Sequence, residues 1–160
     1  DRSVGQAKYP AIDESQLTLT QRKIVAVTQQ EFAAKPKGTK YAEGVSEPWC
    51  ADFVSWVMKE SGVPLKNPNS GSWRIPGTYT LLEYYKQVGR FKDITSGYTP
   101  RIGDVALYRN SPIFGDHTNI VLKNDAGVLT TVGGNENNTV RIYTNEKKNY
   151  TGLLGYGTLD

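Results

Sequence analysis

Apolar residues recur at helical spacing in three segments of the first half of the chain. The first predicted helix covers residues 20–34, and the second begins near Pro48 and stops at Gly62. A loop rich in Asn, Ser, Gly and Pro follows over residues 67–76. The third predicted helix comes after this loop and stops at Gly89. The first half of the chain therefore predicts a layer of helices.

The period changes after Gly103, where short runs rich in β-branched and aromatic residues alternate with turn residues. Five such runs predict strands, at residues 104–108, 117–123, 127–131, 139–144 and 153–158. Helices followed by strands indicate an α+β fold with an antiparallel sheet. Residues 1–19 show no period, so we expect an arm or linker remnant there and a folded domain over residues 20–160.

Composition is typical of a soluble globular protein with one domain. Of the 160 residues, 38% are hydrophobic and 22% are charged, and the formal net charge is +3. The basic residues are scattered rather than interleaved with aromatic residues, so nucleic acid is not an expected partner. No apolar stretch approaches the roughly 18 residues that a membrane-spanning helix needs.

Cysteine and histidine are so scarce in this chain that several classes of site are excluded. The chain has one cysteine, Cys50, and one histidine, His117. An intramolecular disulfide and a zinc site built from several Cys and His ligands are therefore excluded. The glycine-containing motifs of common serine hydrolases and nucleotide-binding proteins are also missing.

Cys50 and His117 are the candidate nucleophile and general base. A cysteine in the first turn of a helix lies near backbone N–H groups, which favour the reactive thiolate. His117 is the only histidine that could take the thiol proton. The alternative interpretation is a buried structural cysteine and an ordinary hydrogen-bonded histidine. Residues that could orient His117 would favour the catalytic interpretation over the structural one.

A predicted hairpin determines what lies beside His117. The strand that contains His117 is followed by a turn and by the next predicted strand. If Lys123 pairs with Leu129 across the hairpin, His117 lies opposite Asn135. A loop that is tighter by one residue places His117 opposite Gly134 instead.

A third catalytic group would accept an N–H of the imidazole and hold the ring in orientation. Asn135 and Glu136 both carry suitable oxygens, but neighbours in a strand point to opposite faces. The first register directs Asn135 toward His117 and Glu136 away, so we expect Asn135 in this role and keep Glu136 as the alternative. The glycines before them, Gly133 and Gly134, would leave the site open to a substrate backbone.

Four stretches, taken in order, carry a resemblance to a known family. They are Trp49-Cys50-Ala51-Asp52-Phe53-Val54, Gly103-Asp104-Val105-Ala106, Gly115-Asp116-His117-Thr118-Asn119-Ile120-Val121 and Val132-Gly133-Gly134-Asn135-Glu136. Together they resemble the cysteine, histidine-dependent amidohydrolase/peptidase (CHAP) family over residues 20–158. The resemblance implies a papain-like fold, in which the helix with the nucleophile packs on an antiparallel sheet that carries the base.

The resemblance also implies a reaction, namely the cleavage of amide bonds in bacterial peptidoglycan. In that case Cys50 is the nucleophile, His117 the general base and Asn135 the orienting residue. Many members have His-Val-Gly where this chain has His117-Thr118-Asn119, a departure that bears on the substrate groove. Many also have Gln where this chain has Glu136, which leaves the third residue ambiguous. Some members bind calcium through an aspartate-rich loop, but residues 36–49 contain no Asp, so we expect no metal or other cofactor.

Several functional interpretations stay open at this stage. We expect a monomeric N-acetylmuramoyl-L-alanine amidase or peptidoglycan endopeptidase that is secreted, associated with the cell wall or delivered by a phage. An interbacterial toxin or a phage lysin would use the same chemistry, whereas an idle wall-binding module could keep the fold alone. Trp49 and Trp73 could line a substrate groove or pack in the core. Asp52 could contact the site or favour the helix N-terminus.

Overall fold

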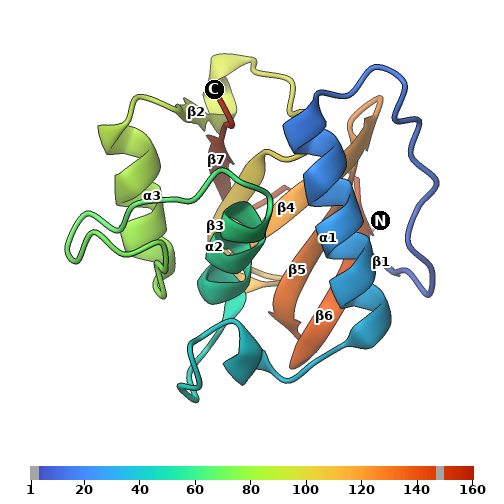
Figure 1. Ribbon diagram of the computed structural model, residues 1–160. Helices are drawn as coiled ribbons and strands as arrows, with labels where there is room; N and C mark the ends of the chain where they lie inside the picture. The colour runs from blue at the N-terminus through green and yellow to red at the C-terminus, as the bar shows by residue number, and fades with distance from the viewer. Residues whose placement is uncertain (1–3, 147–149) are drawn as a thin grey trace.

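The computed structural model describes residues 4–146 and 150–160, and within them it contains three α-helices and a seven-stranded antiparallel sheet (Figure 1). The helices are α1 (Leu19–Ala34), α2 (Cys50–Glu60) and α3 (Thr78–Gln87), with short 3-10 helices at Gly38–Lys40 and Ile94–Ser96. The strands are β1 (Val4–Gly5), β2 (Phe91–Asp93), β3 (Val105–Ser111), β4 (Gly115–Asp125), β5 (Val128–Glu136), β6 (Thr139–Asn145) and β7 (Leu153–Gly157). The predicted α+β, papain-like architecture is confirmed.

The sheet has the strand order β1-β6-β5-β4-β3-β7-β2. Helix α2 packs against the central strands β4 and β5, and α1 packs beside it against β6 (Figure 1). The core between these elements consists of interlocking aliphatic and aromatic side chains, among them Phe53, Val54, Val57, Ile120, Leu122 and Val132. The helix that begins with Cys50 is therefore held rigidly on the middle of the sheet.

Two side-chain contacts fix the predicted loop over residues 67–76 against the start of α2. The Arg74 guanidinium donates from Nε to Asp52 Oδ1 at 2.8 Å. The backbone N–H of Ile75 donates to Ser55 Oγ at 3.1 Å. Because Asp52 and Ser55 are completely buried, these bonds satisfy polar groups that water cannot reach.

The described part of the N-terminal segment packs on the sheet and on α1. Val4 in β1 pairs with Thr144 in β6 and so extends the sheet. The Tyr9 ring lies 6.4 Å from that of Phe32, and its hydroxyl is 2.8 Å from Thr28 Oγ1. The segment therefore covers α1 although its sequence lacks a regular period.

The β4–β5 hairpin does not have the predicted register at its turn. Lys123 pairs with Thr130 rather than with Leu129. An irregularity between Val121 and Lys123 then shifts the pairing by one residue, so that Ile120 faces Val132. A bulge of this kind changes the alternation of side chains and cannot be read from a hydrophobic pattern.

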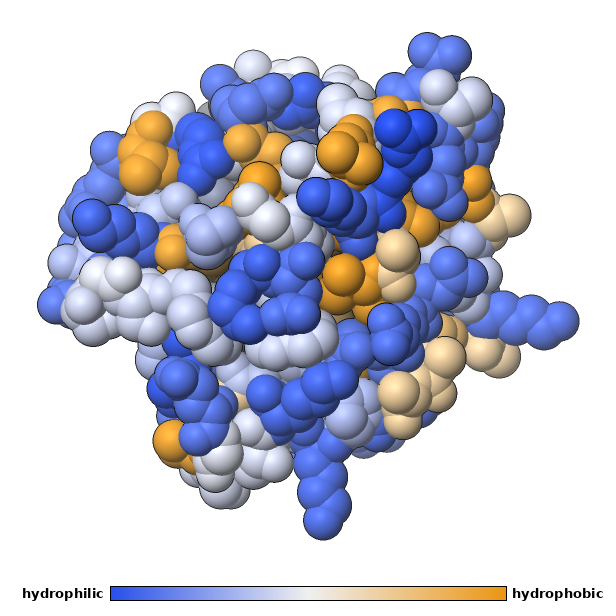
Figure 2. Space-filling view, in the orientation of Figure 1, coloured by the Kyte–Doolittle hydropathy of each residue, from blue (hydrophilic) through white to orange (hydrophobic). Residues whose placement is uncertain are grey.

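The face of the molecule that Figure 1 presents is largely polar. Figure 2 shows hydrophilic residues over most of this face, with hydrophobic residues in small separate groups. None of the helices in the described ranges is both long enough and apolar enough to cross a lipid bilayer.

Candidate active site

A cleft of about 400 Å³ opens at the beginning of α2. Its walls come from the residues before and at the start of α2, the start of α3 and the start of β4: Glu47, Pro48, Cys50, Pro76, Gly77, Thr78 and Asp116. Cys50 is only 7% exposed, so most of the residue is covered and the remainder borders the cleft. The only cysteine of the chain thus lies at a helix N-terminus beside a cavity.

The imidazole of His117 links Cys50 to Glu136. His117 Nε2 lies 2.7 Å from Glu136 Oε2, and both side chains are almost entirely buried. The Cys50 side chain lies close enough to the ring to contribute to the raised pKa of His117. Since Nε2 is occupied by Glu136, the other ring nitrogen, Nδ1, is the one available to the thiol. A thiol, an imidazole and a carboxylate are thus grouped here, and these are groups that could serve as nucleophile, base and orienting group.

Electrostatic contacts determine the protonation of His117. Burial alone would lower the pKa of the imidazole, but the neighbouring Cys50 side chain, the hydrogen bond with Glu136 and the charge of Glu136 outweigh burial. Together they raise the pKa of His117 to about 9. His117 is therefore an imidazolium at neutral pH, the form that pairs with a thiolate and can donate a proton to a leaving group.

Aromatic rings fix the plane of the imidazole. Phe114 stacks on His117 with a centroid distance of 5.0 Å and an interplanar angle of 19°. Tyr108 lies at 6.1 Å from the same ring, and Tyr143 meets Phe114 edge-on at 5.5 Å. These rings leave His117 only 5% exposed, which strengthens its interaction with the carboxylate.

The orienting position next to His117 is occupied by Glu136 and not by Asn135, so the predicted direction of the two side chains is wrong. Asn135 has a left-handed backbone with φ of 56°, and the β5–β6 pairing shifts between Gly133 and Glu136. This bulge interrupts the alternation on which the prediction rested. Within the described residues, Asn135 forms no hydrogen bond with His117, while Glu136 forms one.

Gly133 and Gly134 are both buried. The expectation that they leave the site open to a substrate backbone is therefore wrong. A Cβ on Gly133 would collide with the Glu136 carboxylate and with Asn119. A Cβ on Gly134 would lie 2.6 Å from the Cβ of Phe53 and 2.7 Å from the Trp49 ring. The glycine pair thus makes room for Glu136 and for α2.

The two candidate substrate-binding tryptophans lie away from the lining of the cleft. Trp49 is 4% exposed, and its ring stacks on Tyr41 at 5.4 Å. The core interpretation therefore applies to Trp49. Trp73 is half-buried, with the Lys59 ammonium 5.0 Å from its ring centroid. The residues that line the cleft include neither tryptophan.

A cluster of charges surrounds Asp52 in the first turn of α2. Arg74 contacts Asp52 at 2.8 Å and both Glu43 and Glu47 at 3.2 Å. Burial and the neighbouring Glu47 raise the pKa of Asp52 to about 7, against the opposing effect of Arg74. The neighbouring Asp52 side chain and the contact with Arg74 lower the pKa of Glu47 despite partial burial. Asp52 therefore stabilises the start of α2 through its contact with Arg74.

Sequence reasoning assigned no role to Asp116 or Asn119. Asp116 lines the cleft and is fixed by the backbone N–H of Asn110 at 2.9 Å and the Tyr79 hydroxyl at 3.1 Å. Asn119 is buried and donates to Glu136 Oε2 at 3.1 Å. The signal for Asn119 is its spacing, because residues two apart in a strand point to the same side.

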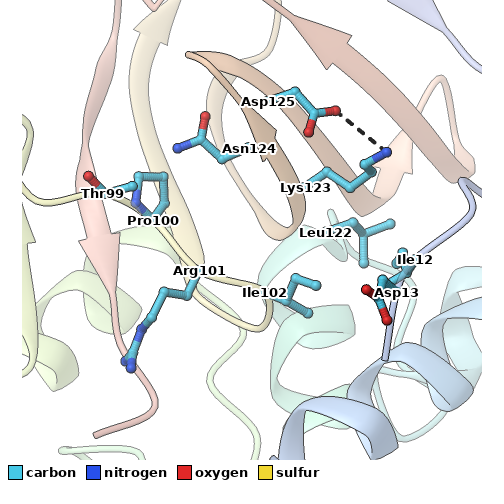
Figure 3. A pocket seen from close by; sticks show the side chains of 10 residues that line it. All are labelled: Ile12, Asp13, Thr99, Pro100, Arg101, Ile102, Leu122, Lys123, Asn124 and Asp125. Atoms are coloured by element: carbon cyan, nitrogen blue, oxygen red, sulfur yellow. Dashed lines mark ion pairs between the residues drawn. The ribbon is translucent and has the colours of Figure 1, made fainter. Parts of the chain in front are cut away.

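Figure 3 shows another cavity, of about 290 Å³, whose lining shares no residue with that of the cleft. Its lining includes Pro100, Arg101 and Lys123, and the ion pair from Lys123 to Asp125 borders it. Cys50, His117 and Glu136 do not line this cavity. In residues 4–146 and 150–160, no three His, Cys, Asp or Glu side chains are grouped so that they could hold a metal ion.

Comparison with known proteins adds one finding to this geometry. The family model of the CHAP domain matches residues 40–135 of the sequence, which is more than half of the chain. The matched region contains Cys50 and His117 and ends one residue before Glu136. None of the curated proteins compared with the chain gives a significant match.

Proposed function

The chain belongs to the CHAP family, and on this premise we propose that it hydrolyses amide bonds in peptidoglycan peptides with Cys50 as the nucleophile. The observation that supports this proposal most strongly is that Cys50 borders the cleft and influences the pKa of His117, which in turn contacts Glu136. A thiol, an imidazole and an orienting carboxylate in this order are the groups that acyl transfer by a cysteine enzyme requires.

The first half of the reaction forms a covalent acyl-enzyme. The Cys50 proton resides on His117, and the thiolate attacks the carbonyl carbon of the scissile amide. Backbone N–H groups in the first turn of α2 have no partner within the helix, so they can stabilise the oxyanion that develops. The imidazolium then donates its proton to the departing nitrogen, the C–N bond breaks, and a thioester remains on Cys50.

The second half of the reaction releases the acyl group. His117, now neutral, accepts a proton from a water molecule that attacks the thioester carbonyl. Collapse of this second tetrahedral species breaks the C–S bond and returns the sulfur as a thiolate beside the imidazolium. Glu136 holds the ring in one orientation through both halves, because its hydrogen bond to Nε2 is maintained while Nδ1 exchanges the proton.

Peptidoglycan as the substrate determines where the enzyme acts. The polymer lies outside the cytoplasmic membrane, so we place the activity at the cell wall, reached by secretion or by delivery from a phage. An amidase would cut between the lactyl group of the sugar and the peptide, whereas an endopeptidase would cut within the peptides. Mass spectrometry of the fragments released from purified peptidoglycan identifies which bond is broken.

The proposal is tested with purified peptidoglycan and three proteins: the wild type, Cys50→Ala and the surface control Gln29→Ala. The wild type and the control should release new amino groups without new reducing sugar ends, because amide bonds and not glycosidic bonds are cut. Cys50→Ala should release none while remaining folded, since a small buried side chain is replaced by a smaller one. Undiminished release by folded Cys50→Ala, or release of reducing ends alone, contradicts the proposal.

A further inference from the structure

A second buried donor holds the carboxylate of Glu136. Its Oε2 accepts one hydrogen bond from His117 Nε2 at 2.7 Å and another from Asn119 Nδ2 at 3.1 Å. The Glu136 side chain is 1% exposed, so its charge depends on these donors rather than on bulk water. Asn119 is completely buried and does not line the cleft, so its effect on the reaction would pass through Glu136.

Tyr108 determines which end of the Asn119 amide faces Glu136. The Tyr108 hydroxyl donates to Asn119 Oδ1 at 3.0 Å. This bond turns the amide nitrogen toward Glu136, whose ionised carboxylate can only accept. Burial raises the pKa of Tyr108 well above its usual value, so the hydroxyl stays protonated and remains a donor. The hydrogen bond from Tyr108 to Asn119 thus fixes the direction of the hydrogen bond from Asn119 to Glu136.

The sheet itself sets the positions of these side chains. His117 and Asn119 are two residues apart in β4 and therefore point to the same side of the strand. Tyr108 pairs directly with His117 from the adjacent strand β3. Because all three residues belong to central strands, their relative positions do not depend on a mobile loop.

We propose that Asn119 is a positioning residue that, oriented by Tyr108, holds the Glu136 carboxylate in line with Nε2 of His117. This inference rests on the proposed function, because it concerns the same site. Without the Asn119 amide, one of the two donors to Oε2 is lost and the carboxylate can turn away from the imidazole. The His117 imidazolium then loses its alignment with the Glu136 carboxylate. The Cys50 thiolate consequently pairs with an imidazolium that is less well oriented.

The expected effects of Asn119→Ala fall on turnover and on pH dependence. We expect kcat to fall by about tenfold to a hundredfold, the range for losing a hydrogen bond to a charged group. KM should stay within about twofold, because Asn119 is absent from the lining of the cleft. The alkaline limit of kcat/KM should move to lower pH, since His117 loses part of the interaction that raises its pKa. Tyr108→Phe, which removes only the hydroxyl, should act in the same direction by a few-fold.

A double-mutant cycle separates positioning from a general structural role. Asn119→Ala and Tyr108→Phe are each measured in the wild type and in Glu136→Gln, with the exposed Asn69→Ala as the matched control. Once the carboxylate is gone, Asn119→Ala should reduce kcat by much less than it does in the wild type. Circular dichroism and thermal unfolding check that each variant is folded; if Asn119→Ala is not, Tyr108→Phe provides the same comparison.

The outcomes distinguish this inference from the proposed function. Folded variants with a wild-type kcat and an unmoved or raised alkaline limit overturn the positioning role of Asn119. So does an equal loss of kcat with and without the Glu136 carboxylate, which is what a merely structural residue would produce. If instead Cys50→Ala retains full activity on peptidoglycan, the proposed function fails, whatever the Asn119 variants do.

Discussion

At the scale of single residues, the site depends on which of two neighbouring side chains contacts His117. Asn135 and Glu136 both carry oxygens that could orient an imidazole, but only Glu136 has its oxygen 2.7 Å from Nε2. The left-handed backbone of Asn135 makes this possible, because it turns the following residue toward the site. Asparagine tolerates this conformation better than most residues.

Glu136→Gln and Asn135→Gly should therefore have very different effects on kcat. Glu136→Gln removes the charge beside His117, and we expect kcat to fall on the order of 100-fold. Asn135→Gly keeps the left-handed backbone and should change kcat by no more than a few-fold. Steady-state assays with a soluble muropeptide make the comparison, with the exposed Glu83→Gln as a control for loss of a carboxylate. A larger loss in Asn135→Gly than in Glu136→Gln would restore the asparagine as the orienting residue.

The pH dependence of activity should show the raised pKa of His117. The imidazolium form is required, so kcat/KM should fall as pH rises through about 9. Glu136→Gln removes a negative charge that raises this pKa, and the alkaline limit should move to lower pH. Profiles of kcat/KM between pH 5 and 10 measure the alkaline limit of the wild type and that of Glu136→Gln. A limit that is identical in the two proteins would mean that Glu136 does not set the protonation of His117.

At the scale of secondary-structure elements, local patterns predicted the helices and most of the strands. Helical spacing in the segment from Cys50 onward and strand propensity around His117 depend on nearby residues alone, and both elements are present. The register of β4 against β5 and the bulge at Asn135 depend on contacts across the sheet. Alternation gave the wrong neighbour of His117 because it assumes an unbroken pleat. Cys50 and His117 were accessible from the sequence, whereas Asn119 and the cleft-lining Asp116 required the fold.

Alanine substitutions at Gly133 and Gly134 should separate activity from stability. A Cβ on Gly133 collides with the Glu136 carboxylate and with Asn119, so Gly133→Ala should displace the carboxylate and lower kcat at least tenfold. A Cβ on Gly134 meets Phe53 and Trp49, so Gly134→Ala should lower the free energy of unfolding by about 1–3 kcal/mol. Urea denaturation and muropeptide assays on both variants provide the test. The account of the glycine pair fails if Gly133→Ala keeps full activity with the Glu136 side chain in place.

At the scale of the whole molecule, the described part of the segment before α1 packs on the rest of the fold. Residues 4–19 have no regular hydrophobic period, yet β1 extends the sheet and Tyr9 packs on the helical layer. Contacts made by a single aromatic residue leave no periodic signal, which is why the sequence suggested an arm. The packing implies that this segment contributes to stability rather than to the chemistry of the cleft.

Tyr9→Ala should therefore destabilise the fold without changing the reaction of the folded protein. We expect the free energy of unfolding to fall by about 2–3 kcal/mol, because a partly buried ring is removed. Tyr9→Phe, which loses only the hydroxyl and its hydrogen bonds with Thr28 and the Val25 carbonyl, should cost about 1 kcal/mol. Urea denaturation gives these values, and kcat measured below the unfolding transition should match the wild type. A Tyr9→Ala protein as stable as the wild type would show that the segment is only loosely attached.

The mechanism depends on the pairing of Cys50 with His117, and the rate of Cys50 alkylation measures this pairing. The chain has no other cysteine, so modification by iodoacetamide reports on this thiol alone. The wild type should already be alkylated rapidly at pH 6, because the imidazolium stabilises the thiolate. His117→Ala should react at least tenfold more slowly at pH 6 and accelerate only toward alkaline pH. Superimposable rate profiles for the two proteins between pH 5 and 10 would contradict the pairing.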